Sequence, residues 1–421
     1  MRALRPQSLT FTFLLGALVT LASFATDMAL PVLAPMAASL GVAPATAALT
    51  MSVFMAGFAI APLALGPISD RFGRRPLLLL GCATFALFGA LGAFAHTLSA
   101  LLLWRTLMGV GAGTVQVLVT ATIRDHFSGA EARVRQSYVS IAAGLAPMIA
   151  PTLGVWVALL GGWRAIYGAL AGVATVLFVF AALFIRESAP GHGQHVLTVR
   201  GTLRSYARVV RHPVSMGYAC IIALCFGCLF AYVSGSSLVL MGVMGVGARF
   251  YGALFAATSA GFVIGSFTNA FLNRRGLSHT RLIGVGLTII ASLAVVLLLL
   301  AASGQLLPAE LIGLVMVSHI AHSVVRANST QGALEPMPEI AGVASAVLTG
   351  MQMITGAAAS AIAATLFDGR TAVAMTATMS VCAVSAFAIH RLVVRPAERR
   401  TARREEIVSL AAGQLVELSR G

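Results

Sequence analysis

The stretch GPISDRFGRRP, residues 66–76, separates two long apolar segments and places four charged residues within eleven positions. One acid, Asp70, stands beside three arginines, and two glycines flank the acid. Charges between two apolar segments of about 20 residues are what a helical hairpin across a bilayer requires, because charged groups leave the hydrocarbon only between spans. The stretch therefore predicts a membrane protein built from helical hairpins.

The composition extends this prediction to the whole chain. Of 421 residues, 58% are hydrophobic and 10% are charged, and the mean hydropathy is +0.92. A soluble domain averages about 25% charged residues, so a soluble protein is excluded. The apolar segments are long and show little strict alternation, which favours helices over a barrel. Twelve spans are predicted, at residues 9–34, 46–68, 76–95, 99–122, 137–160, 164–185, 213–241, 250–272, 282–302, 308–328, 341–366 and 371–392.

The formal charge of +15 comes from arginines placed in alternate loops. The chain has no lysine, and the opposite loops carry only Arg164, Arg249 and Arg370. Positive residues concentrate on the cytoplasmic side of inner-membrane proteins, so both termini are predicted to be cytoplasmic. The basic charge thus sets topology, and no nucleic-acid partner is expected. Arg2, Arg5 and the apolar residues 9–24 imitate a secretory signal, but the apolar segment continues past the cleavage-like alanines and is interpreted as the first span.

A polar, basic segment at 186–213 divides six spans from six. We therefore predict an N-terminal six-helix bundle at 1–186, a cytoplasmic linker with a surface helix at 187–212, a C-terminal bundle at 213–392 and a basic cytoplasmic tail at 393–421. The tail mixes arginine and glutamate and is expected at the anionic lipid surface or loosely ordered.

The two halves carry a decayed repeat of the opening stretch. Counted from Gly265, the second half again has a polar residue four positions later, Asn269, and a phenylalanine two further on, Phe271. The acid Asp70 has become asparagine. A repeat at the same place in each half is typical of transporters assembled from duplicated bundles.

Several motifs resemble those of the major facilitator superfamily. GPISDRFGRRP resembles the loop between the second and third helices of that family, and LLLWRTLMGVGAG (101–113) resembles its fourth-helix motif with Arg105. GLAPMIAPTLGVWV (144–157) resembles the fifth-helix antiporter motif, with Ala146 in place of the usual glycine. TDMALPVLAPM (26–36) and NSTQGALEPMPEIAGVASAVLTGMQMITGA (328–357) resemble the bicyclomycin/chloramphenicol-resistance (Bcr/CflA) branch of drug:proton antiporters. The match covers residues 10–390.

The resemblance implies an all-α membrane protein of twelve helices in two pseudo-symmetric six-helix bundles around a central cavity. It implies proton-coupled efflux of amphipathic antimicrobials, such as phenicol- or bicyclomycin-like compounds, by alternating access across the inner membrane. It also implies a cytoplasmic gate formed by Gly66, Asp70, Arg71, Gly73, Arg74 and Arg75, and an antiporter helix motif formed by Gly144, Pro147, Pro151 and Gly154. A proton-coupled symporter or exporter of a small metabolite is the alternative.

The expected partners are the drug, protons and membrane lipid, with the protein as a monomer. No enzyme is predicted, because the sequence shows no nucleophile elbow, phosphate loop or His/Asp metal constellation, and no cofactor or metal is expected. Cys225 and Cys228 have metal-knuckle spacing, but no second Cys or His pair accompanies them, so they are interpreted as small apolar residues.

Asp27 is the acid that decides the mechanism proposed from the sequence. It is the one charged residue between Arg5 and Asp70 and the one acid placed well inside a predicted span. An isolated carboxylate there costs about 2.5 kcal/mol or more, so an intramembrane acid is a functional candidate. Arg105 is its natural partner, because both lie roughly 10 Å inside the outer ends of their spans at 1.5 Å per residue. Matched depth allows an ion pair or a water-bridged pair, and a static structural salt bridge is the alternative to a titrating acid.

Further candidates rest on local patterns. Pro31 and Pro35 predict a kinked or interrupted outer half of the first span, and the prolines of 144–157 predict a bend whose glycines allow tight helix crossing. His319, His322 and Arg326 share one face of the tenth span, where a packed histidine pair is favoured over a proton relay. The candidate apolar lining of the cavity comprises Met28, Tyr138, Tyr232 and Gln352, with Met241, Met351 and Met353.

Overall fold

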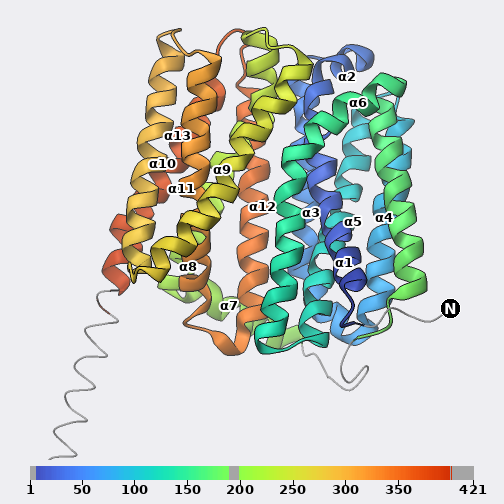
Figure 1. Ribbon diagram of the computed structural model, residues 1–421, viewed down its shortest axis with the longest axis vertical. Coiled ribbons are helices and arrows are strands. Elements are labelled where there is room, and N and C mark those ends of the chain that lie inside the picture. Colours follow the sequence, from blue (N-terminus) through green and yellow to red (C-terminus); the bar gives the residue numbers. More distant parts are fainter. Residues whose placement is uncertain (1–5, 189–198, 399, 401–421) are drawn as a thin grey trace, which may run out of the picture.

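The computed structural model describes residues 6–188, 199–398 and 400, and describes backbone only at residues 63–68, 70, 71, 130, 199, 200, 202 and 338. The described part is built from helices that run side by side in two groups, with α1 to α6 in one half and α8 to α13 in the other (Figure 1). The start of the first helix and the C-terminal end of the last described helical segment lie at the same end of the bundle (Figure 1), here called the terminal side. The other end is called the opposite side.

The first half begins with a broken span. Helix α1 (Leu9–Asp27) is followed by a 3-10 turn, η1 (Leu30–Val32), and by α2 (Leu33–Leu40). Pro31 lies inside the 3-10 turn, so the predicted interruption is present. The helices that follow are α3 (Pro44–Phe72), α4 (Arg74–Ala93), α5 (Leu98–His126) and α6 (Gly129–Phe184).

Helix α6 contains two spans. Its 56 residues include the predicted span 137–160 and all but the last residue of the predicted span 164–185, and helical geometry fails between them, at Gly161 and Gly162. Gly162 has φ +66, a left-handed value that a side chain rarely allows. Eleven helices in the described residues are long and apolar enough to cross a membrane. Because α6 crosses twice, the described chain has the twelve predicted crossings.

The second half starts after the surface helix α7 (Val199–Arg211), which lies across the terminal side (Figure 1). It consists of α8 (Pro213–Ser237) with the π-helical turn η2 (Leu238–Val243), α9 (Ala248–Arg274), α10 (His279–Ala302), α11 (Pro308–Leu334), the 3-10 turn η3 (Pro338–Ile340), α12 (Ala341–Thr365) and α13 (Val373–Ile389) with the π-helical turn η4 (His390–Val394). The predicted surface helix in the linker is therefore present.

The two halves pack together through α3 against α12 and α6 against α9. Ser52 Oγ donates to Ser360 Oγ over 3.0 Å between α3 and α12. A Cβ on Gly252 of α9 would lie 2.5 Å from Thr152 Oγ1 of α6, so these helices touch as closely as glycine allows. Ser52 and Gly252 lie near the starts of their helices, and Ser360 near the end of α12, so these contacts lie toward the opposite side.

Helix crossings inside each half also depend on glycine. A Cβ on Gly109 of α5 would lie 2.1 Å from the Phe54 carbonyl oxygen of α3, and one on Gly261 of α9 would lie 2.5 Å from the Met316 carbonyl oxygen of α11. In lipid, no hydrophobic effect drives helices together, so helix association depends on close packing. Small residues allow the backbones to approach closely enough for that packing. Close crossings at a glycine therefore occur in both halves.

Candidate functional site

Asp27 is the last residue of α1, and 4% of its surface is exposed. After Met28 the chain continues as the 3-10 turn η1, which contains Pro31, and then as α2. Asp27 forms no ion pair with any cation in the part of the chain that the structure describes. The C-terminal end of a helix carries partial negative charge, so α1 does not stabilise an ionised carboxyl at this position. The acid is buried at a break in the first span.

Arg105 of α5 is bound by main-chain oxygen atoms and an aromatic ring. Its Nη1 donates to the Ala25 carbonyl over 3.0 Å, and its Nε donates to the Thr50 carbonyl over 3.3 Å. Its guanidinium carbon lies 4.5 Å from the centre of the Phe54 ring, a cation–π distance, and 1% of the residue is exposed. The carbonyls spread the cost of a buried cation over two helices.

The direct ion pair between Asp27 and Arg105 is not formed in this structure. Arg105 instead contacts the last turn of α1 through Ala25, two residues before the acid. The matched depth predicted from the sequence is therefore consistent with the contact between α5 and α1. The water-bridged arrangement stays a prediction.

Tyr167, in the second span of α6, is a further neighbour of Arg105. Its ring centre lies 5.7 Å from the guanidinium carbon, and its hydroxyl is buried without a hydrogen-bond partner in the described residues. No motif marks this position. Only the packing of α6 beside α5 reveals a hydroxyl group next to the buried cation.

The antiporter-like motif of α6 lies directly beside Asp27. A Cβ on Gly154 would stand 2.1 Å from the carbonyl oxygen of Met28, the residue after the acid. Pro147 and Pro151 lie inside α6, which continues through both. At Gly144 an added Cβ would meet nothing within 4 Å. The tight crossing predicted for both glycines is therefore present at Gly154 only.

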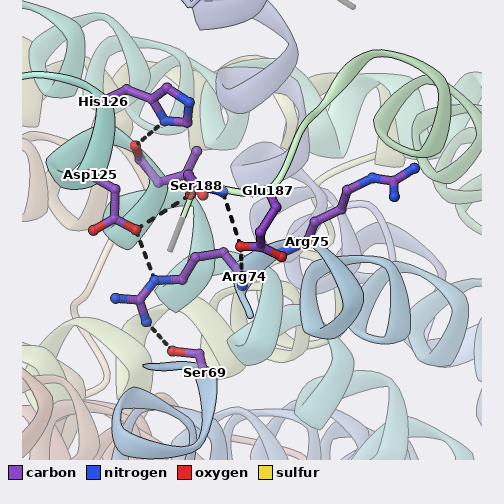
Figure 2. Close-up of polar contacts among 8 residues, drawn as sticks. Ser69, Arg74, Arg75, Asp125, His126, Glu187 and Ser188 are labelled. Atoms are coloured by element: carbon purple, nitrogen blue, oxygen red, sulfur yellow. Dashed lines mark hydrogen bonds and ion pairs between the residues drawn. The ribbon is translucent and has the colours of Figure 1, made fainter. Parts of the chain in front are cut away.

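On the terminal side, the end of the opening stretch forms a polar cluster (Figure 2). Arg74 Nε donates to Asp125 Oδ2 over 2.9 Å in an ion pair whose side chains are each 6% exposed, and Arg74 also donates to Ser69. The main-chain amides of Arg74 and Arg75 donate to the two oxygens of Glu187, over 2.8 and 3.2 Å. The cluster joins the start of α4 to the ends of α5 and α6.

Gly73 makes this geometry possible. It lies between α3 and α4 with φ +93 and ψ 153, a conformation open essentially to glycine. The bend exposes the first amides of α4, and an acid accepts well at a helix N-terminus. Glu187 fills that position. The motif glycine is thus explained by backbone geometry.

Three predicted gate residues cannot be placed in this cluster. The surroundings of Gly66 and the side chains of Asp70 and Arg71 lie outside the described part of the structure, so the gate they were assigned stays a prediction. Their counterparts in the second half are described. Asn269 accepts from Asn328 of α11 over 2.7 Å, and a Cβ on Gly265 would lie 2.5 Å from the Ile320 carbonyl oxygen. In that half, the glycine allows close packing and the polar residue bridges to a neighbouring helix.

The residues predicted to line a cavity are scattered. Met28 and Tyr232 are buried, Gln352 is half-buried and Tyr138 is 51% exposed. Tyr232 shares a hydroxyl hydrogen bond of 3.2 Å with Thr258, inside the second half. The structure thus brings Met28 to Gly154 but does not gather the set.

The two histidines of α11 are buried. His319 Nδ1 lies 2.8 Å from the Thr258 carbonyl, and its ring stacks on Phe262 at 4.4 Å. His322 Nδ1 lies 2.8 Å from the Ser318 carbonyl, while its Nε2 is buried without a hydrogen-bond partner in the described residues. The packed pair favoured from the sequence fits this arrangement. No group of three or more His, Cys, Asp or Glu side chains in the described part could hold a metal ion.

Comparison with known proteins identifies the family. The sequence profile of the Major Facilitator Superfamily matches residues 15–360. The chain belongs to the Major Facilitator Superfamily. It is a transporter rather than an enzyme, and it is a multi-pass membrane protein. The resemblance stated from the motifs is confirmed.

The most informative relatives are named as resistance proteins. Over 90% of this chain and 95% of the relative, it is 27% identical to the bicyclomycin resistance protein homolog of Haemophilus influenzae. It is 30% identical to the multidrug resistance protein MdtL of Klebsiella pneumoniae over 81% of this chain and 84% of that relative. It is also 29% identical over 90% of its length to YdgK of Bacillus subtilis, an uncharacterized transporter of this type that is covered over 94%.

Solved structures share the fold. A bacterial homolog of the lysosomal transporter Spinster, in an inward-facing and occupied conformation, superposes with a TM-score of 0.71 over 93% of this chain and 98% of that one, at 15% identity. The human organic anion transporter MFSD10 superposes with a TM-score of 0.66 over 92% of this chain and 100% of that one, at 20% identity. These likenesses confirm two six-helix bundles of the major facilitator fold.

Proposed function

We propose that this transporter exports amphipathic antimicrobial compounds, such as phenicol- or bicyclomycin-like drugs, in exchange for protons across the bacterial inner membrane. The relatives named for bicyclomycin and multidrug resistance support drug export. The observation that carries the proton coupling is a buried carboxyl at the break between α1 and η1. It lies beside the close crossing of α6 and has no cation paired with it in the described residues.

The coupling follows from competition at Asp27. An ionised carboxyl buried in the membrane is costly, so taking up a proton and binding a polar drug group are two ways to lower that cost. If proton and drug favour opposite states of the transporter, each displaces the other, and antiport results. Arg105 supplies a fixed positive charge that lowers the free energy of the ionised Asp27 carboxylate. Tyr167, beside Arg105, supplies a hydroxyl to the same region.

The conformational change is a rocking of the two halves about their contacts. We assign the terminal side to the cytoplasm from the arginine asymmetry. The bundles then correspond to residues 1–186 and 213–392, with the linker 187–212 and the tail 393–421 on the cytoplasmic side. The close contacts Ser52–Ser360 and Gly252–Thr152 lie toward the opposite side and serve as the closed outer gate of this conformation. The cluster around Arg74 serves as the inner latch together with Asp70 and Arg71, and the protein works as a monomer in contact with lipid.

A susceptibility panel tests the proposal. A host lacking its own drug pumps expresses the wild type, Asp27→Asn or a vector, at matched amounts of protein in the membrane. We expect the wild type to raise the inhibitory concentration of at least one phenicol or bicyclomycin-like drug, and Asp27→Asn to lose that protection. A panel in which the wild type protects against no drug contradicts export. Protection that Asp27→Asn retains in full contradicts coupling at this acid.

A further inference from the structure

Asp27 of the first half and Tyr251 of the second half lie beside the same turn of α6. A Cβ on Gly154 would stand 2.1 Å from the carbonyl oxygen of Met28, the residue after the acid. A Cβ on the glycine after Tyr251 would stand 2.5 Å from Thr152 Oγ1. These two contact points on α6 are two residues apart, about 3 Å along the helix axis. The 3-10 turn η1, which follows the acid, also packs against α8 and α9. The end of α1 and the start of α9 are therefore neighbours across the boundary between the halves.

Both side chains at this place are buried. The Asp27 carboxyl and the Tyr251 hydroxyl are not hydrogen-bonded to each other, but they are near enough to interact electrostatically. A buried carboxylate with no cation paired to it needs a donor when it ionises. The hydroxyl of Tyr251 is such a donor, and it is contributed by the half that moves relative to the acid in the proposed rocking motion.

Tyr251 shares a hydrogen bond with Ser236 of α8. Its Oη lies 2.8 Å from Ser236 Oγ, which also lies 2.9 Å from the Val233 carbonyl oxygen. Each hydroxyl donates once and a carbonyl only accepts, so two arrangements of the protons fit these distances. In the first, Ser236 donates to Val233 and Tyr251 donates to Ser236. In the second, Ser236 donates to Tyr251, and the Tyr251 proton is free to point at a negative charge.

The other titratable side chains near this place have neighbours within their own halves. Arg105 of α5 is bound by two main-chain carbonyls of the first half, and Tyr167 of α6 lies beside its guanidinium group. Tyr232 of α8 is hydrogen-bonded to Thr258 of α9, and the ring of His319 packs on Tyr232 with the centres 5.6 Å apart. In the part of the chain that the structure describes, the acid therefore meets a titratable group of the second half at Tyr251.

We propose that the Tyr251 hydroxyl is a positioning group that acts through Asp27 and favours its ionised form while the opposite side is closed. A hydroxyl that donates to a carboxylate makes a charge-assisted bond, roughly twice as strong as a neutral one. When the halves rock and the opposite side opens, α9 moves away from α1 and the acid loses this donor. Asp27 then takes a proton from water on the opposite side and releases it toward the terminal side when Tyr251 returns. The inference rests on the proposed function, because it takes Asp27 as the coupling acid, and it adds the conformation in which that acid ionises.

Infrared difference spectroscopy tests this proposal through the carbonyl stretch of a neutral carboxyl group. The purified full chain in neutral detergent is titrated with acid and base in the absence of drug, and Asp27→Asn identifies the band of Asp27. We expect Tyr251→Phe to move the midpoint of protonation to higher pH by about one unit, a tenfold gain in proton affinity, because one hydrogen bond to a charged group is lost. A midpoint that stays in place or moves to lower pH overturns the proposal.

Tyr218→Phe is the matched control, because it also removes a buried tyrosine hydroxyl from the second half. Tyr218 donates to Glu398 on the terminal side, so its loss should leave the midpoint of Asp27 unchanged. An equal shift in this variant overturns the assignment. If Tyr251→Phe does not fold, a fluorinated tyrosine at position 251 keeps the ring and the hydroxyl. Its more acidic hydroxyl is a stronger donor and should move the midpoint to lower pH, and an unchanged midpoint overturns the proposal.

The dependence on conformation is tested by holding the opposite side closed. The Oγ atoms of Ser52 and Ser360 lie 3.0 Å apart across the two halves, so Ser52→Cys and Ser360→Cys together can be cross-linked by oxidation. Cross-linking should lower the midpoint when Tyr251 is present and should have little effect in Tyr251→Phe. Equal effects of the cross-link in both backgrounds overturn the link between Tyr251 and the closed state.

These measurements use no drug, so their outcomes are separate from those of the proposed function. If the midpoint shifts as expected but the wild type exports no drug, drug export fails and the assignment of Tyr251 stands. If drug is exported and Asp27 titrates in the same way with tyrosine or phenylalanine at position 251, the assignment fails and the proposed function stands.

Discussion

Replacing Gly154 with alanine tests whether the close crossing beside Asp27 is essential. An alanine Cβ at this position would stand 2.1 Å from the Met28 carbonyl oxygen, and the atom it meets is backbone. A normal carbon–oxygen contact needs more than 3 Å, so α6 and the η1 segment must separate by roughly 1 Å. Overpacking of this kind costs about 1–3 kcal/mol. Alanine also gains about 1 kcal/mol in helix propensity, which offsets part of the cost.

Gly144→Ala is the matched control from the same helix and the same motif. An added Cβ there meets nothing within 4 Å, so only the gain in helix propensity remains, about 1 kcal/mol of stabilisation. The two variants should therefore differ by about 1–3 kcal/mol, with Gly154→Ala the less stable. The same displacement moves Met28 and hence Asp27, so Gly154→Ala should also lose drug export.

The assay is thermal unfolding of both purified variants in the same detergent, together with drug export per molecule in the membrane. A Gly154→Ala variant that is as stable and as active as Gly144→Ala refutes the reasoning. In that case the close contact between Gly154 and Met28 contributes nothing measurable to stability or export. Loss of export with unchanged stability would instead show that α6 must slide at this point.

Four further predictions follow from other contacts. Asp27→Asn should abolish proton release on drug addition, measured in detergent with a pH dye. If proton release persists, the coupling site is another residue, and His322 is the first to test. Asp125→Asn should cost about 3–5 kcal/mol, because it leaves the buried Arg74 cation unpaired, and Arg74→Gln added to it should recover part of that loss, as a double-mutant cycle measures. Reporter fusions at residue 421 should be active only in the cytoplasm; periplasmic activity would reverse the topology. Hydrogen bonds from the Arg370 and Thr371 amides and the Thr371 hydroxyl hold the pKa of Asp368 below its ordinary value of 3.8. Asp368→Asn should therefore lower the unfolding temperature at pH 7, and the difference from wild type should shrink as the pH falls through that lowered pKa, where the wild-type carboxyl loses this stabilisation.

The fold was predictable from the sequence because membrane insertion leaves strong marks on composition. Apolar segments must be as long as the bilayer is thick, and arginines must stay on one side. The interruption of the first span followed from Pro31, and the division of α6 into two spans followed from the length of its apolar segment. Gly162 was not singled out, although its φ of +66 creates that division. A glycine pair in a glycine-rich chain gives no local signal of this kind.

Contacts within the site were predictable only in part. Depth along the spans brought Arg105 near the end of α1, but depth cannot distinguish a carboxylate acceptor from a main-chain carbonyl. Ala25 offers a carbonyl because Asp27 ends the helix and leaves the last turn without partners for its oxygens. A helix end is therefore a ligand for the arginine as well as the place where the acid lies. Sequence patterns report side chains, and this acceptor belongs to the main chain.

The same limitation explains the cluster at Gly73. The motif marks Asp70 and its arginines as a gate and gives no sign of acids elsewhere in the chain. In the described residues, Arg74 pairs with Asp125 from α5, and the amides of α4 bind Glu187, which follows α6. Both acids lie more than 50 positions away in sequence and outside the motif. One loop thus joins three helix ends through its bent backbone, and a change at any of these ends reaches the other two. In the proposed inner latch, that connection matters more than any single ion pair, because it couples the start of α4 to the ends of α5 and α6.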